Sequence, residues 1–205
     1  MSHTRLDQLS DGIFAIVMTI LVFEIKLPLL PFTPSNMDVW LAFKSLVHPL
    51  LSYILSFTLL FTYWRAHHFF VSIYAKNVDL RLININILFF MLVSLIPFST
   101  SLLGSYSALE IVVVAFGLHI VLIGLTLYWM RHYVLYSDHI KNPEISRHEI
   151  VGSTVRTLVP VFFALIAMAL AFVNVQSSLV VFTLAVFFNL SSTSTRLFEK
   201  IFKSV

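Results

Sequence analysis

A carboxylate, Asp11, stands at the beginning of the first long apolar stretch, where Ser10-Asp11-Gly12 leads into the apolar run 13–23. An aspartate at the centre of a membrane helix costs about 2.5–3.5 kcal/mol on insertion scales, so a carboxylate in such a place indicates function. The alternative is structural, because Ser10 or Asp11 could cap a helix N-terminus at the level of the lipid headgroups. The residues alone leave both interpretations open.

Two adjacent histidines, His67 and His68, form the densest polar cluster within the apolar stretches. Membrane enzymes with iron centres hold the metal with several histidine boxes, but the other histidines of this chain are scattered, and neighbours on a helix diverge by about 100°. A metal enzyme is therefore disfavoured. Two interpretations stay open: an interfacial pair that hydrogen-bonds to carbonyls or headgroups, and a partner for Asp11.

Other patterns that support catalysis or cofactor binding are missing from the sequence. It has no glycine-rich phosphate loop, no Gly-x-Ser-x-Gly elbow and no cysteine, so we predict neither an enzyme nor a cofactor. It also lacks the Thr-Val-Gly-Tyr-Gly segment whose stacked carbonyls select potassium in the usual channels. A channel built from this chain would have to select its ion differently.

The composition is that of a membrane protein, with 59% hydrophobic and 11% charged residues, against about 25% charged in a typical soluble domain. A helix needs about 20 apolar residues to cross a hydrocarbon core of about 30 Å. Six stretches come near this length, and we predict an all-α membrane protein with a single domain over residues 1–205. The expected spans are 9–25, 40–64, 82–103, 108–130, 154–173 and 177–192.

Six spans place both termini on one side of the membrane, and the basic residues then segregate. Eleven of the 13 lysines and arginines fall on the side of the termini, and only Lys26 and Lys44 fall on the other. By the positive-inside rule, both termini are expected in the cytoplasm. The net charge of +3 is therefore explained by basic residues that follow the membrane topology, and no nucleic-acid partner is predicted. The connection from Arg131 to Gly152 is expected to be a solvated cytoplasmic loop.

Three motifs, in order, make the chain resemble the transmembrane protein 175 family, which comprises the endolysosomal potassium channels and their shorter prokaryotic relatives. The family signature is an arginine, three residues, then Phe-Ser-Asp; here Arg5 precedes Leu9-Ser10-Asp11, with leucine in place of phenylalanine. The second motif is Trp64-Arg65-Ala66-His67-His68. The third is the segment 95–106, LIPFSTSLLGSY, which is similar to the family's Leu-Pro-Phe…Leu-Leu-Gly-Glu-Tyr. A single six-helix unit resembles the prokaryotic branch.

The resemblance implies a homotetramer in the membrane of a prokaryotic cell, with the first helices of four copies around a central pore. The absence of an internal repeat agrees with an assembly of several chains. By the same carry-over, a constriction is formed by the residue five positions after the motif aspartate, Ile16, with Thr19 and Phe23 as the next layers of one helical stripe. Without the resemblance, core packing would be the favoured interpretation of this stripe. The expected partners are other copies, membrane lipids and permeant monovalent cations, above all potassium.

A ring of isoleucines offers no ligand for an ion, so such a constriction would block by dewetting and must widen to conduct. Potassium sheds water more readily than sodium, which predicts a modest selectivity. The resemblance also implies a network that ties Arg5 and Asp11 to His67 or His68, with Trp64 in the same motif. The alternative is a secondary transporter or proton-conducting protein that uses Asp11 and His67/His68 as titrating groups.

Overall fold

The computed structural model describes residues 3–142 and 147–190, and this part of the chain is helical with no strand. The predicted all-α class is therefore confirmed for the described residues. The elements are α1 (His3–Ile20), the 3₁₀ turn η1 (Leu21–Glu24), α2 (Asn36–Ser45), α3 (Val47–His68), the π-helical turn η2 (Phe69–Ile73), α4 (Leu80–Ser94), α5 (Ile96–Tyr106), α6 (Glu110–Tyr136), α7 (Arg147–Ala171) and α8 (Val175–Leu190).

The predicted apolar stretches lie mostly within these helices, although residues 108–109 precede α6. In the described residues, four helical segments are long and apolar enough to cross a membrane: His3–Glu24, Asn36–Ile73, Leu80–Tyr106 and Glu110–Tyr136. In the last two helices the apolar parts, Thr157–Ala171 and Val175–Ala185, are shorter. The count of six spans stays a prediction, and residues 191–192 of the last expected span lie outside the described residues.

The first helix begins at His3, six residues earlier than expected. Ser10 and Asp11 therefore lie about two turns inside α1, where backbone N–H groups already bond to the preceding turn. The interpretation of Ser10 or Asp11 as a helix N-cap is wrong for this reason. Their side chains are free to serve as contacts between helices.

Prolines explain two of the helix junctions. Pro49 has no N–H for the carbonyl of Ser45, and α2 ends at Ser45 just before α3 begins. Pro97 lies in the first turn of α5, directly after the break between α4 and α5. Pro160, by contrast, lies inside α7, which continues through it. Membrane helices tolerate such a proline because neighbouring groups satisfy the freed carbonyl.

The expected loop from Arg131 to Gly152 is mostly helix, which corrects the sequence interpretation. The helix α6 continues to Tyr136, and α7 begins at Arg147. The described part of the remaining connection pairs with the turn between η2 and α4: Lys76 N donates to the Ile140 carbonyl at 2.6 Å, and Asn142 N donates to the Tyr74 carbonyl at 2.8 Å. These bonds tie two connections at the same end of the bundle to each other.

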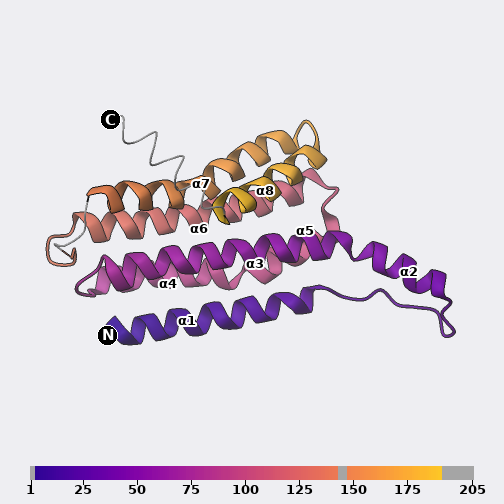
Figure 1. The fold of residues 1–205 in the computed structure, drawn as a ribbon, viewed down its shortest axis with the longest axis horizontal. Helices are drawn as coiled ribbons and strands as arrows, with labels where there is room; N and C mark the ends of the chain where they lie inside the picture. The colour runs from indigo at the N-terminus through magenta and orange to yellow at the C-terminus, as the bar shows by residue number, and fades with distance from the viewer. Residues whose placement is uncertain (1–2, 143–146, 191–205) are drawn as a thin grey trace.

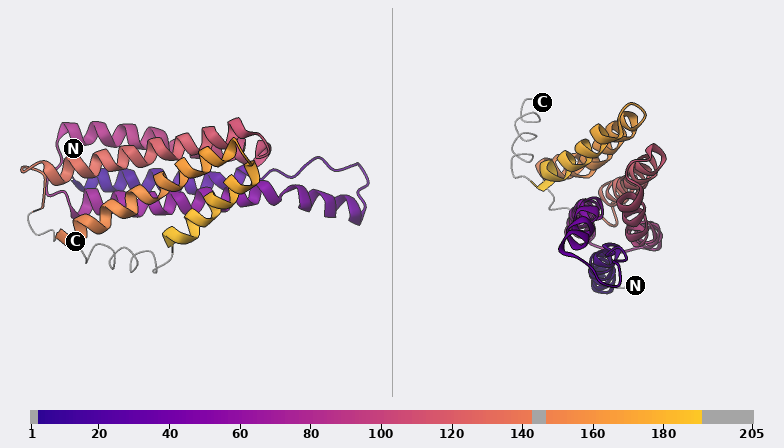
Figure 2. Two further views of the ribbon diagram at one scale, coloured as in Figure 1. Left: turned by 90° about the horizontal axis from the view of Figure 1, so that it is seen from above. Right: turned by 90° about the vertical axis from the view of Figure 1, so that its right-hand side faces the viewer.

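The helices run roughly parallel and antiparallel in one elongated bundle (Figure 1). Viewed along the bundle, α1 lies at one edge and α7 and α8 lie at the opposite edge (Figure 2). Glycines allow close packing of α6 on α7: a Cβ added to Gly117 would lie 2.4 Å from Cγ of Met168, and one added to Gly124 would lie 2.2 Å from Cγ2 of Val161. Because α1 lies at the edge of the bundle, only one of its sides packs against the rest of the chain.

Candidate functional site

The side of α1 that faces its own chain is regular and closely packed. Its buried residues recur every three or four positions, which is the spacing of one helical face, and they lie against α3 and α4. They are Leu6, Ser10, Phe14, Val17 and Leu21. Four of these five side chains are apolar, so Ser10 is the exception that needs a polar partner.

The opposite side of α1, together with the turn η1 that continues it, carries the three residues of the expected pore stripe. Ile16 is 59% exposed and Phe23 is 71% exposed, and Thr19 is also exposed. The Thr19 hydroxyl lies 2.8 Å from the Ile16 carbonyl and 3.0 Å from the Ala15 carbonyl, so its proton is directed at the backbone. Its oxygen lone pairs therefore remain available to a group outside the chain.

Gly12 lies on this same side, one turn nearer the N-terminus than Ile16. A Cβ added to Gly12 would meet no atom within 4 Å. Arg5 is exposed too, and at about 100° per residue it falls on the same face as Ile16. Within the described residues the exposed face of α1 has no cover from its own chain.

Ser10 finds its partner in His67 of α3. The Ser10 hydroxyl lies 3.1 Å from Nδ1 of His67, and Nε2 of His67 lies 2.6 Å from Oδ1 of Asn86. The Asn86 amide nitrogen donates to the Leu82 carbonyl at 2.8 Å, so its Oδ1 accepts and Nε2 of His67 carries the proton. Nδ1 then accepts from Ser10. Ser10, His67 and Asn86 thus form a row of side chains, and a neutral imidazole satisfies both hydrogen bonds of the row.

The row is buried among aromatic side chains. His67 is 1% exposed, and its ring stacks on Phe89 with the centroids 5.2 Å apart and the planes within 4°. Asn86 is also buried, in α4. The sequence analysis missed Asn86, although an asparagine within the apolar run of α4 was an available signal, because a buried amide in lipid needs a partner.

Asp11 is bonded to Trp64 and to neither histidine. The indole N–H of Trp64 donates to Oδ1 of Asp11 at 2.8 Å. The same indole stacks on His68 with centroids 6.1 Å apart. In the described chain, therefore, the motif histidines contact Ser10 and Ser72 instead of Asp11, and Arg5 makes no ion pair with Asp11. Within the single chain, Asp11 is thus joined to Trp64 of the motif, and the link from Arg5 and Asp11 to a histidine stays a prediction.

A second polar cluster, which the sequence analysis missed, lies nearer the start of α1. Ser72 donates to Oδ1 of Asp7 at 2.7 Å, and its oxygen lies 3.1 Å from Nδ1 of His68. On the same helix His3 lies 3.3 Å from Asp7, and its other ring nitrogen contacts the Val71 carbonyl. The signal in the sequence was the i, i+4 spacing of His3 and Asp7. This cluster fastens the first turn of α1 to the end of α3.

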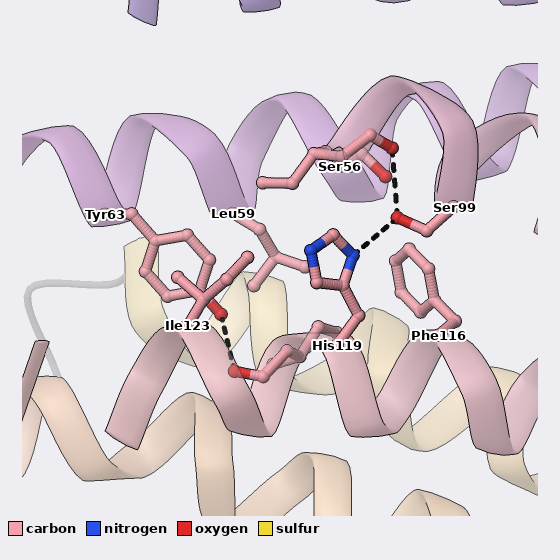
Figure 3. Close-up of a pocket in the computed structure, with 9 residues that line it drawn as sticks. Ser56, Leu59, Tyr63, Ser99, Phe116, His119 and Ile123 are labelled. Atoms are coloured by element: carbon pink, nitrogen blue, oxygen red, sulfur yellow. Dashed lines mark hydrogen bonds between the residues drawn. The ribbon is translucent and has the colours of Figure 1, made fainter. Parts of the chain in front are cut away.

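A third histidine, His119 of α6, lies beside a small cavity within the bundle (Figure 3). Its Nδ1 lies 2.8 Å from the Ser99 hydroxyl, and its Nε2 lies 2.9 Å from the Leu92 carbonyl. A neutral ring satisfies both contacts. Among residues 3–142 and 147–190, no three histidines, aspartates or glutamates come together in a way that could hold a metal ion.

Comparison with known proteins decides the class of this arrangement. The profile of the family described as endosomal/lysosomal potassium channel TMEM175 matches residues 5–97, the part that contains all the candidate site residues. The crystal structure of a lysosomal potassium-selective channel TMEM175 homologue from Chamaesiphon minutus matches with a TM-score of 0.72 and 28% identity, over 92% of this chain and 96% of that one. In sequence and in fold, the chain is therefore similar to the TMEM175 family.

Relatives over most of their length agree with this similarity. A potassium channel of Chamaesiphon minutus is 29% identical over 93% of this chain and 95% of its own length. A potassium channel of a Chryseobacterium species is 25% identical over 84% of each chain, and one of Streptomyces collinus is 25% identical over 85% of each. TMEM175 is a family of potassium channels and not of enzymes. Together with the apolar helices, this similarity makes the chain an integral membrane protein.

Proposed function

We propose that this chain is the subunit of a homotetrameric potassium channel whose pore is lined by α1. The observation that carries the proposal is the uncovered stripe of α1, with Ile16 and Phe23 exposed on the side opposite its packed face. A helix at the edge of a bundle that leaves a stripe of this kind open fits an axis shared with other copies. Potassium is proposed as the permeant ion because the relatives that match over most of their length are named potassium channels.

Ile16 is proposed as the narrowest point of this pore. Four isoleucine side chains around an axis offer no oxygen to a cation, so a tight ring would exclude water and close the path. When the ring widens, the ion that dehydrates more readily passes more easily, which favours potassium over sodium by a modest factor. Phe23 and Ile16 would then be apolar layers on either side of Thr19.

Thr19 is proposed as the polar layer next to the constriction. Because its hydroxyl proton is directed at the backbone carbonyls of the preceding turn, its oxygen presents lone pairs to the axis. Oxygen lone pairs favour cations over anions. This geometry gives Thr19 a role in ion preference that a valine of the same shape could not fill.

The polar contacts of α1 are proposed to set the direction of the stripe. Ser10 with His67, and Asp11 with Trp64, fix the rotation and height of α1 against α3. A shift of one residue along the helix would turn Ile16 away by about 100°. These residues are therefore positioning residues, and no ion contact is assigned to them.

The whole chain 1–205 is proposed to form one six-helix domain with cytoplasmic termini in a prokaryotic cell membrane. The support is the segregation of lysine and arginine, of which only Lys26 and Lys44 fall outside the cytoplasmic side. In a transporter or proton pathway, Asp11 and the histidines would titrate during each cycle. The closed row from Ser10 through His67 to Asn86 gives His67 no free nitrogen for such a role.

The test is ion flux through purified protein in liposomes under opposed potassium and sodium gradients. The parent should conduct potassium in preference to sodium, and Ile16→Asn should raise the flux or abolish the preference. Ile87→Asn is the matched control, because Ile87 is equally exposed but lies on α4. Saturable exchange without unitary currents would favour a transporter, and flux that is indifferent to Ile16 would overturn the pore assignment.

A further inference from the structure

His119 is an ionisable residue that the proposed pore does not use. It lies inside α6, which is long and apolar enough to cross a membrane. An ionisable side chain in such a helix is costly and therefore indicates a function, for which its partners must be named. Both ring nitrogens of His119 are bonded within the chain, and the bonds lead to two different helices.

The two partners of His119 lie on opposite sides of a helix break. Leu92 belongs to the last turn of α4, Ser99 belongs to the first turn of α5, and the break falls between them. Nε2 of His119 donates to the Leu92 carbonyl at 2.9 Å, because a carbonyl can only accept. Nδ1 then accepts from the Ser99 hydroxyl at 2.8 Å (Figure 3). One imidazole thus joins the end of α4 to the start of α5.

The backbone at this break is a weak connection by itself. Pro97 has no N–H for the carbonyl of Val93, four residues earlier. Leu95 N donates to the Leu92 carbonyl, three residues earlier, at 3.1 Å, and bonds of this kind have poorer geometry. Sharp helix kinks are found at prolines for the same reason. The angle between α4 and α5 therefore depends on side chains that span the break.

The helix α5 in turn supports the end of the proposed pore helix. It packs against α3 and against η1, the turn that continues α1 and contains Phe23. The Thr100 hydroxyl of α5 donates to Ser56 of α3 at 2.7 Å, and a Cβ added to Gly104 would lie 3.0 Å from Cα of Pro49. These contacts join α5 to α3 and η1, whereas the imidazole on α6 joins it to α4.

We propose that His119 is a positioning residue that fixes α5 across the break and thereby holds η1, with Phe23, in one place beside the pore axis. The inference rests on the proposed pore and adds the residue that fixes its Phe23 layer. A cavity beside the imidazole is lined by side chains of α3, α5 and α6 (Figure 3). Close packing resists movement, and this cavity leaves α5 room to shift when the imidazole is removed. The Ile16 layer is held separately, by the contacts of Ser10 and Asp11 with α3.

The test places a trifluoromethyl label on a single cysteine in α5 and records fluorine NMR spectra of the full-length protein in lipid nanodiscs. The chain has no cysteine of its own, and Phe98 is exposed in the first turn of α5, so Phe98→Cys supplies the label site. The parent background should give one main resonance. His119→Leu removes both hydrogen bonds and should add a second resonance. Because each lost hydrogen bond shifts an equilibrium by a factor of about five, the second resonance should grow at least by that factor.

Two further variants separate hydrogen bonding from the filling of space. His119→Gln keeps an amide N–H that can reach the Leu92 carbonyl, so it should restore most of the main resonance. Ser99→Ala removes the link at its α5 end only and should also add the second resonance. It keeps the proposal testable if His119→Leu assembles poorly.

Two controls belong to the same experiment. His132→Leu changes another histidine of α6, whose ring contacts two tyrosines of that helix, and it should leave the α5 resonance unchanged. The same label on Ile87→Cys reports on α4, where Ile87 is exposed. This second label should show no new resonance in His119→Leu.

An unchanged α5 resonance in His119→Leu, or an equal change at the Ile87 label, would overturn the proposal. Liposome flux tests the connection to the pore: His119→Leu should discriminate less between potassium and sodium than the parent, and His132→Leu should discriminate as the parent does. A second α5 resonance with unaltered ion preference would overturn that connection. A parent that conducts no ion would remove the proposed pore, while the α5 spectra would still show whether His119 fixes α5.

Discussion

The indole N–H of Trp64 donates a hydrogen bond to the carboxylate of Asp11 at 2.8 Å, across the contact between α3 and α1. The carboxylate that enters the membrane at a cost is therefore used to join two helices. The bond sits one residue away from the contact of Ser10 with His67. Together they fix α1 at adjacent points of its length.

Replacing Trp64 with phenylalanine tests this bond. The change keeps an aromatic ring beside His68 and removes the N–H, so we expect a loss of about 1 kcal/mol in stability and a disturbed ion selectivity. Thermal unfolding in detergent and liposome flux measure the two effects. Trp129→Phe is the control, since Trp129 is exposed on α6. Equal effects of the two changes would contradict a specific role for the bond.

Ser10→Ala should destabilise the chain more than its size suggests. Nδ1 of the buried His67 would lose its donor, and an unsatisfied buried polar group costs about 1–3 kcal/mol. Ser94→Ala provides the comparison, because Ser94 bonds only to the Phe90 carbonyl of its own helix in the described structure. Both are measured by thermal unfolding. A Ser10→Ala protein as stable as Ser94→Ala would show that Ser10 and His67 do not depend on each other.

The glycines of this chain should differ sharply in their tolerance of alanine. Gly124→Ala places a methyl group 2.2 Å from Val161, and overpacking of this kind costs about 1–3 kcal/mol. Gly12→Ala meets no atom within 4 Å, so the fold of the single chain should tolerate it. Unfolding midpoints of the two variants decide the matter. If Gly12→Ala lost stability while Gly124→Ala did not, the expected order would be contradicted, and another copy would have to lie against Gly12.

Asp79, which precedes α4, predicts a pH dependence of stability. Burial alone would raise the pKa of this carboxyl, but hydrogen bonds from Tyr133, the Leu82 N–H and His139 outweigh it and hold the pKa below its usual value. A carboxyl with a lowered pKa in the folded state stabilises the fold above the unfolded-state pKa of about 3.9. This stabilisation is lost as the pH falls through the lower, folded-state pKa.

The comparison of parent with Asp79→Asn measures that contribution. The parent should be more stable than Asp79→Asn by a constant amount near neutral pH, and this difference should disappear in strong acid. The free energy of unfolding of both proteins is measured at a series of pH values. Asp138→Asn is the control, because Asp138 is exposed in the same region. An advantage of the parent that grows on acidification would have the wrong sign for a carboxyl with a lowered pKa.

The amino-acid sequence by itself determined the class of the molecule and the location of its helices. Apolar stretches of membrane length are local properties of the chain, and the described parts of all six predicted stretches are mostly helical. The three motifs in order were enough to indicate the TMEM175 family, which the comparisons confirm. Such features are readable because each depends on residues close together along the chain.

Only the tertiary structure decided which side chains meet. The sequence left Asp11 between a helix cap and a histidine partner, whereas the start of α1 at His3 and the approach of α3 give it Trp64. It gave no reason to join Ser10, His67 and Asn86, which lie on three different helices. The physical reason is that a contact between helices depends on the rotation and height of each, and a change of one residue in where a helix begins alters both.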